Sequence, residues 1–183
     1  MTNLHDVRAV SLLPAEFADV QPPVESGSTP LRSQTDLAAP PDWVCLDWSE
    51  LETFEAVEQH FIDRGVQFHN AIALHPSNPA YPPVTGTAVL LAAPRSGWLE
   101  ASFAQPVRYV SSYVTSSRRA VLSAFDADNQ PLARSETPGA NLAGTDADTV
   151  PNLELSLHAE NIHRITIQAF DGQLTLGEFR FSY

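Results

Sequence analysis

The sequence predicts an all-β protein: an antiparallel jelly-roll β-sandwich with one short helix and an extended N-terminal arm. Short runs rich in Val, Leu, Tyr and Phe alternate with turn signals, most clearly between Gly97 and Ala133, as expected for consecutive antiparallel strands. Apolar residues follow a helical spacing in one stretch near residues 50–63. Prolines interrupt residues 1–42, so no regular element is expected there.

Length and composition favour one folded domain with an appendage. The chain has 183 residues, of which 43% are hydrophobic, and a chain of this size buries a substantial core. Its net charge is −12 and its 10 basic residues are all Arg. An acidic field of this size opposes binding to nucleic acid or anionic lipid, which needs clustered cations. We interpret the basic pair Arg118 and Arg119 as a solvated turn.

The cysteine count and the N-terminal residues give expectations about compartment. The single Cys45 excludes an internal disulfide, and its apolar neighbours favour a small core residue. The N-terminus lacks the basic region and long apolar run of a secretory signal. No apolar run approaches the ~20 residues that span a membrane. We therefore expect a cytoplasmic protein without a membrane span.

Residues 1–42 are predicted to form an extended, Pro-rich arm outside the domain. The segment Glu25–Thr29 has the composition of a flexible linker. Two fates are open: the arm is disordered, or it lies across its own surface or that of a partner. In the second case its apolar side chains are the expected partner-binding residues, namely Leu4, Val10, Leu12, Leu13 and Phe17.

The domain is predicted to span residues 43–183 and to begin with a strand over Trp43–Trp48. Ser49 and Glu52 then form an S-x-x-E capping box. Apolar residues follow at helical spacing, with Gly65 as a C-terminal stop, so a short helix is predicted within 50–63. A strand continues from Gly65 towards Ala73.

Further strands are predicted over residues 88–92, 98–103, 107–115, 120–125, 152–157, 162–169 and 173–181. Residues 104–106 are interpreted as a turn, and residues 75–87 and 135–148 as long loops. Asp171-Gly172 is a strong hairpin signal. One face of each strand supplies the predicted core, which comprises Val66, Phe68, Val89, Leu99, Phe103, Val110, Leu122, Leu155, Ile165, Ile167 and Phe179.

The order of several short motifs resembles galactose-binding-like jelly-roll domains, which occur in bacterial carbohydrate-binding modules and surface proteins. The resemblance covers about residues 43–183 and leaves the arm outside. Its motifs are Leu46-Asp47, Arg64–Phe68, Trp98–Phe103, Ala124–Asn129, Ile162–Ile167 and Leu174–Phe181.

The resemblance implies a possible structural calcium ion. In many such domains an acidic pair on the last strand meets an acidic residue of the first strand. Here the corresponding residues are Gly177-Glu178 and Asp47, so one carboxylate of the pair is missing. Because calcium takes six to eight oxygen ligands, Asp47 and Glu178 would need backbone and water to complete the site. The alternative is that both are solvated strand residues.

The resemblance also implies a glycan ligand bound by exposed aromatic rings. The available rings are Trp43, Trp48, Tyr81, Trp98, Tyr109 and Tyr113, although core packing is the alternative role for each Trp. The predicted ligand-binding residues are Tyr81, Asn78 and His75, in the proline-rich loop, together with Trp98. Fold alone does not establish this function.

No catalytic signature is present in the sequence, and no catalytic residue is predicted. The six histidines lack the spacing of a metal site. Asp126 and Asp128 break the calcium-loop pattern at the following residues and are interpreted as a hairpin turn. The preferred hypothesis is a non-catalytic binding protein that docks into a larger protein assembly through its arm. The alternative is a carbohydrate-binding module with loop aromatics, and an enzyme ranks last.

Overall fold

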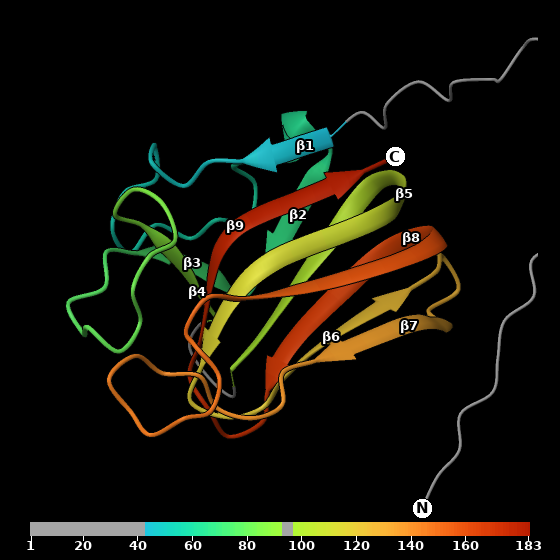
Figure 1. The fold of residues 1–183 in the computed structure, drawn as a ribbon. Coiled ribbons are helices and arrows are strands. Elements are labelled where there is room, and N and C mark those ends of the chain that lie inside the picture. Colours follow the sequence, from blue (N-terminus) through green and yellow to red (C-terminus); the bar gives the residue numbers. More distant parts are fainter. Residues whose placement is uncertain (1–42, 93–96) are drawn as a thin grey trace, which may run out of the picture. The chain divides into compact units, whose positions relative to one another are not determined.

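The computed structural model describes residues 43–92 and 97–183, and this part of the chain is built almost wholly of strands (Figure 1). In chain order the elements are β1 (Trp43–Leu46), the 3-10 helix η1 (Ile62–Arg64), β2 (Val66–His69), β3 (Ala71–Leu74), β4 (Val89–Ala92), β5 (Trp98–Ser116), β6 (Ala120–Phe125), β7 (Pro131–Glu136), β8 (Leu153–Ala169) and β9 (Leu174–Ser182). The described residues contain no helix long and apolar enough to cross a bilayer.

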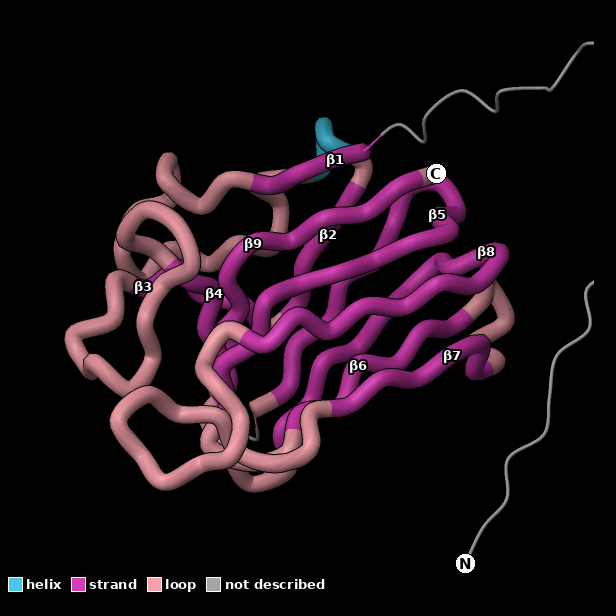
Figure 2. The backbone as a smooth tube through the Cα atoms, in the orientation of Figure 1, coloured by secondary structure: helices cyan, strands magenta, loops and turns pink. Residues whose placement is uncertain are grey.

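Every strand pair is antiparallel, in the order β3-β4-β9-β5-β8-β6-β7, with β1 beside β9 and β2 beside β5. The long strands β5 and β8 pair with each other along both halves. The first half of β5 also pairs with β2, whereas its second half pairs with β9. The predicted all-β antiparallel jelly-roll sandwich is therefore confirmed, with β5 and β8 shared between its two layers (Figures 1 and 2).

The change of layer occurs at irregularities in both long strands. The register of β5 against β8 shifts between Ser102 and Val107 and again before Tyr109. In β8, Asn161 has a positive φ of 64°. Bulges of this kind bend a strand and allow it to serve two packed sheets. The prediction of a turn at residues 104–106 is therefore wrong, as is the division of 152–169 into two strands.

The core lies between the two layers and is rich in aromatic rings. Phe68 of β2 and Phe103 of β5 belong to the first layer, and Phe179 and Phe181 of β9 to the second. The ring centroids of Phe68 and Phe179 are 5.2 Å apart, and those of Phe103 and Phe181 are 5.1 Å apart. These contacts join the layers directly. All of the predicted core residues are buried.

The helix predicted within 50–63 is not formed. Ala56 instead bridges to Ile72, and the Val57 N–H donates to the carbonyl of Ala71 at 3.0 Å. Phe54, with a positive φ of 70°, is exposed rather than buried. Residues 54–57 therefore lie beside β3 and bond to its backbone, with turns on either side. Only the single 3-10 turn η1 remains.

Two further predictions need correction. No strand is predicted at β7, because the sequence indicates a turn up to Pro131 and a loop rich in Thr, Gly, Asn and Asp from Ser135. The structure instead forms β7, whose residues are mostly exposed and pair with β6. Cys45 is exposed on β1 rather than buried in the core. The predicted arm and its residues Leu4, Val10, Leu12, Leu13 and Phe17 lie outside the described residues.

Candidate functional site

A hollow lined by aromatic and charged side chains lies on the outer face of the second layer, where β1, β9, β5 and β8 run side by side. The register places Trp43 opposite Ser182 and Ser182 opposite Tyr109. The next row aligns Cys45, Arg180 and Ser111. A hollow of about 420 Å³ opens here, lined by Trp43, Val44, Cys45, Tyr109, Ser111, Glu154 and Arg180. We call it the Trp43 groove.

Strand alternation explains why these side chains share one face. Along β9, Phe179 and Phe181 point into the core and are fully buried, so Arg180 between them points outward. Likewise Val110 of β5 is buried beneath Tyr109 and Ser111. Successive residues of a strand point to opposite faces, and four neighbouring strands therefore present their outward residues together.

Two aromatic rings form one wall of the Trp43 groove. The ring centroids of Trp43 and Tyr109 are 5.0 Å apart, with an interplanar angle of 75°. Trp43 is 53% exposed although it lies in a strand. The small Ser182 lies between the two residues in the sheet, which leaves room for the rings to meet. The edge-to-face pair holds the exposed indole in a defined orientation.

Charged and hydroxyl groups form the other wall. The Arg180 guanidinium donates to the carboxylate of Glu178 and lies 6.0 Å from the ring centroid of Tyr113. The hydrogen bond with Glu178 raises the pKa of Arg180, which therefore stays charged. Glu154 of β8 is exposed and adds acceptor oxygens, whereas Ser111, which also lines the groove, is only 2% exposed. The groove thus combines ring faces with donors and acceptors.

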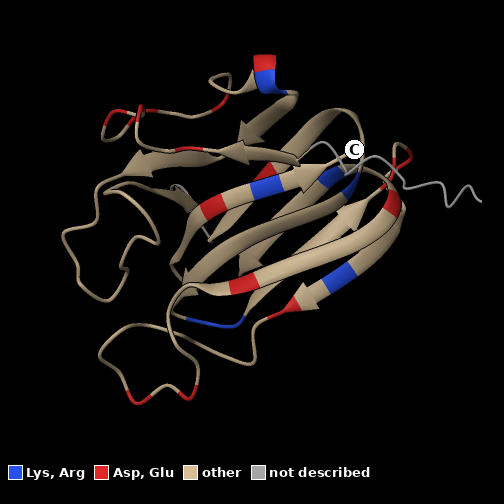
Figure 3. Ribbon diagram, turned by 45° about the horizontal axis from the view of Figure 1, so that its top comes forward, with Lys and Arg blue, Asp and Glu red and all other residues tan. Residues whose placement is uncertain are grey.

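The electrostatic environment of the described residues contains no continuous basic stripe. Figure 3 shows the basic residues dispersed over several elements of the sandwich.

The predicted residues Tyr81 and Asn78 line a second, smaller hollow of about 220 Å³. The prediction that Tyr81 is exposed is wrong: it is 7% exposed, and its hydroxyl donates to Gln173 Oε1 at 3.2 Å. Burial raises the pKa of this phenol. The Asn78 side chain accepts from the Ala80 N–H at 3.0 Å, which shapes the loop. A ligand-binding role for this pair stays a prediction.

The other two predicted ligand residues do not join that hollow. His75 is exposed but is not among its lining residues. Trp98 begins β5 in the first layer, and its carbonyl accepts from the side-chain amide of Asn70. The four predicted residues therefore do not form one constellation.

Asp47 and Glu178, the predicted calcium ligands, each have a nearby partner. The Asp47 carboxylate accepts from the hydroxyl of Ser49 at 2.7 Å and from its N–H at 2.9 Å. These bonds lower the pKa of Asp47. Glu178 is paired with Arg180. No cluster of three or more His, Cys, Asp or Glu suited to a metal ion occurs among the described residues, and a calcium ion held by Asp47 and Glu178 together with backbone and water stays a prediction.

Sequence reasoning named Trp43 and Tyr109 as available rings but missed Arg180, Glu154 and Ser111. Alternation along β9 and β8 marks Arg180 and Glu154 as outward-facing, because each lies between apolar neighbours in the sequence. Nothing local shows that Trp43, Tyr109 and Arg180 occupy neighbouring strands. The groove depends on pairing between segments far apart in the chain.

Comparisons with known proteins give the following findings. No protein-family model matches the sequence, and no curated protein matches it. Solved structures similar to the chain include a DUF4465 family protein from Bacteroides caccae, with 6% identity and a TM-score of 0.44, covering 66% of this chain and 83% of that one. Another is the arabinose-bound α-L-arabinofuranosidase MgGH51, with 12% identity and a TM-score of 0.43, covering 73% and 25%.

A third similar structure is that of the carbohydrate-binding module TmCBM61 in complex with β-1,4-galactotriose. It has 12% identity and a TM-score of 0.33, covering 71% of this chain and 93% of that one. At these values the strand pairing described above, rather than the similarity, defines the fold of the chain as a β-sandwich.

Proposed function

We propose that the chain is a non-catalytic binding module that recognises a carbohydrate in the Trp43 groove. The observation that carries the proposal is the perpendicular pair of Trp43 and Tyr109 beside the Arg180–Glu178 ion pair. Sugars present a C–H face that packs on an aromatic ring and hydroxyls that need donors and acceptors. Both features are available on one rigid sheet surface.

The rigidity of the strands favours a binding site on the sheet surface over a binding site in the loops. Trp43, Tyr109 and Arg180 all belong to strands whose alternate residues are buried in the core. A site on sheet strands loses less conformational freedom on binding than a site on a loop. The rings that support the proposal are therefore strand residues, in contrast to the loop aromatics expected from the sequence.

The polar groups supply selectivity in this proposal. The Arg180 guanidinium has five N–H donors and is oriented by Glu178. Glu154 is exposed and supplies acceptor oxygens. A sugar with neighbouring hydroxyls matches a guanidinium and a carboxylate that lie close together, whereas an aliphatic ligand leaves both groups without a partner.

The test is to titrate the protein with a panel of neutral oligosaccharides built from galactose, glucose, xylose or arabinose. Trp43 is an exposed Trp, whereas Trp48 is buried, so stacking on Trp43 should shift the fluorescence to shorter wavelength. Trp43→Ala should remove the shift and weaken binding at least about tenfold, or ~1.4 kcal/mol.

Phe54→Ala provides the control, because Phe54 is 75% exposed and is not a groove residue. It should bind the panel as the parent protein does. Equal loss of binding in the Trp43 and Phe54 variants, or no binding by any sugar of the panel, would count against the carbohydrate assignment.

We propose in addition that residues 1–42 attach the module to a protein partner. The support comes from the sequence, which places Leu12, Leu13 and Phe17 in a proline-rich segment outside the sandwich. Trp43, the first residue of β1, also lines the groove, and residues 1–42 precede it in the sequence. Replacing Leu12 and Leu13 by Asp should abolish co-purification of the partner, and unchanged co-purification would contradict this role.

A further inference from the structure

The outer face of the first layer carries a separate hollow with a different chemistry from the Trp43 groove. Its volume is about 410 Å³, and it is lined by Arg119, Val121, Ser123, Arg134, Gln168 and Phe170. Strand pairing explains the grouping. Val121 of β6 lies between Glu136 of β7 and Gln168 of β8, while Ser123 lies opposite Arg134. We call this place the Arg134 hollow.

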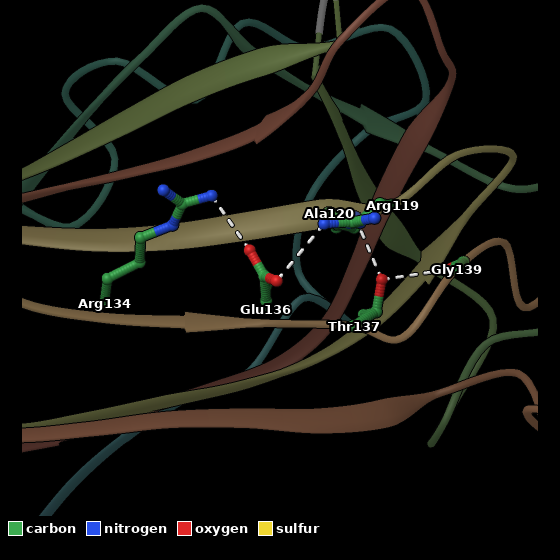
Figure 4. A network of polar contacts seen from close by, with 6 residues as sticks. All are labelled: Arg119, Ala120, Arg134, Glu136, Thr137 and Gly139. Carbon is green, nitrogen blue, oxygen red and sulfur yellow. Dashed lines mark hydrogen bonds and ion pairs between the residues drawn. The ribbon is translucent and has the colours of Figure 1, made fainter.

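Two guanidinium groups share one carboxylate beside this hollow (Figure 4). Arg119 Nη1 lies 3.3 Å from Glu136 Oε1, and Arg134 Nη2 lies 2.8 Å from Glu136 Oε2. The three groups therefore carry a formal charge of about +1 at neutral pH. On a chain whose net charge is −12, this local excess of positive charge gives the hollow a preference for anions.

Buried contacts hold this arrangement in place. Thr137, which follows Glu136, is fully buried; its hydroxyl accepts from the Ala120 N–H at 2.9 Å and donates to the Gly139 carbonyl at 2.8 Å (Figure 4). The Thr137 N–H donates to the Ala120 carbonyl at 2.9 Å. These bonds join the end of β7 to the start of β6, so the strand positions of Arg119 and Glu136 are defined.

An aromatic ring and neutral polar groups complete the lining. Phe170, directly after β8, is 79% exposed, although burial of such a ring would be favourable. Val121 adds an aliphatic surface, and Ser123 and Gln168 add hydroxyl and amide groups. The hollow thus offers an apolar wall beside two guanidinium forks.

We propose that the Arg134 hollow binds a carboxylate carried on a ring-sized organic body. A guanidinium matches the planar carboxylate with two parallel N–H···O bonds, and the Phe170 ring covers one face of the attached ring. Each guanidinium has five donors, and its contact with Glu136 uses one of them. Because the exposed ion pairs with Glu136 contribute little stability, displacing Glu136 costs a ligand carboxylate little, and the contact with Phe170 supplies affinity that a new exposed ion pair alone would not.

The ring body has two possible sources, a sugar acid and an aromatic acid, and the experiment separates them. Galacturonic acid, benzoate and neutral galactose are titrated against the full chain, and affinities are measured by calorimetry. All titrations are repeated with Trp43→Ala, which isolates this hollow from the Trp43 groove. At least one of the two acids should still bind Trp43→Ala, and galactose, which lacks a carboxylate, should bind this variant much more weakly than that acid.

Binding by galacturonic acid alone assigns the hollow to sugar acids, and binding by benzoate alone assigns it to aromatic acids. Both outcomes support the proposal. Binding by neither acid, or equal binding of galactose and galacturonic acid to Trp43→Ala, overturns it. Because this hollow and the Trp43 groove lie on different layers, failure here leaves the carbohydrate assignment intact.

Substitutions of Arg134 and of Glu136 are expected to change the affinity for the acid in opposite directions. Arg134→Gln removes a guanidinium and should weaken acid binding about tenfold. Glu136→Gln removes the competing carboxylate and should tighten binding several-fold. Arg108→Gln is the matched control: the Arg108 side chain is 63% exposed, as is that of Arg134, and pairs with Glu160 instead. Unchanged melting temperatures would show that all variants are folded, and equal affinities of the Arg134 and Arg108 variants would overturn the proposal.

Discussion

Two glycines with the same backbone conformation have different surroundings. Gly97 precedes β5 and has a φ of 58°, and Gly86 lies in the loop before β4 with a φ of 61°. A Cβ at Gly97 would approach the Ala169 carbonyl oxygen to 2.6 Å and would also meet the Gly172 carbonyl. At Gly86 a Cβ would have no neighbour within 4 Å. Comparing alanine substitutions at these two positions therefore separates the cost of the left-handed backbone conformation from the cost of steric crowding.

Gly97→Ala is expected to destabilise the protein more than Gly86→Ala. Left-handed backbone costs a residue with a Cβ roughly 1–2 kcal/mol, and both variants incur this cost. Only Gly97→Ala also forces the hairpin between β8 and β9 to shift, which should bring its loss to roughly 3 kcal/mol or more. Urea unfolding measures the difference, and equal losses at the two positions would show that the close approach has no energetic consequence.

At the scale of elements, one buried amide attaches the long loop 137–152 to β5. Asn141 is fully buried. Its Nδ2 group donates to the Val114 carbonyl at 2.7 Å and to the Val150 carbonyl at 3.2 Å. Its Oδ1 atom accepts from the Ser116 N–H at 2.7 Å. The side chain thus satisfies backbone groups of β5 that have no strand partner at that end.

Asn141→Ala should lower the free energy of unfolding by roughly 2–4 kcal/mol, because several buried backbone groups lose their partner at once. Thr145→Ala in the same loop is the control. Its hydroxyl donates to the Leu142 carbonyl in an exposed position, so the change should be within about 0.5 kcal/mol. Similar, small losses in both variants would mean that the loop is held by other contacts.

The same loop also contacts the proline-rich loop before β4. The Ala143 N–H donates to the Ala80 carbonyl at 3.0 Å, and the Asn152 side chain donates to the Pro82 carbonyl at 3.0 Å. Figure 2 shows both loops at the same end of the sandwich. The long loops predicted from composition are thus joined by hydrogen bonds.

At the scale of the whole molecule, the described core contains all the residues predicted to form it, and none of these lies before residue 43. Deleting residues 1–40 should therefore leave the sandwich folded. We expect the melting temperature to change by less than about 3 °C, which corresponds to ~1 kcal/mol for a domain of this size. Circular dichroism should retain the β signal.

A large fall in melting temperature on deletion would show that residues 1–40 contribute to the folded domain. The comparison needs a partner-free preparation, because a bound partner raises apparent stability by mass action. The same deletion should leave sugar binding in the Trp43 groove unchanged, since the groove residues all follow position 42.

The fold class was predictable because its signals are local. A short apolar run between turn signals marked β6 at its observed bounds, and Asp171-Gly172 marked the turn between β8 and β9. The helical spacing within 50–63 was misleading. Leu51, Val57 and Phe61 are buried as that spacing requires, but pairing with β3 supplies the backbone hydrogen bonds that a helix would have made.

The candidate site was less predictable than the fold. Trp43 and Tyr109 were recognisable as rings, but exposure distinguishes a binding surface from a core residue, and Tyr81 shows that a loop position does not guarantee exposure. Arg180 and Glu154 carry no motif in the sequence. Arg180 lies opposite Ser111 of β5 and Glu154 lies opposite Tyr113 of the same strand, so their place in the groove arises only from the pairing of β9, β5 and β8.

The sequence by itself determined where strands form and which residues face inward, because a period of two is a property of the local backbone. The tertiary structure decided that β5 and β8 bend from one layer into the other, and hence which strands are neighbours. That choice depends on bulges and on contacts between distant segments. It alone brings Trp43, Tyr109 and Arg180 together on one layer, and Arg119, Arg134 and Phe170 on the other.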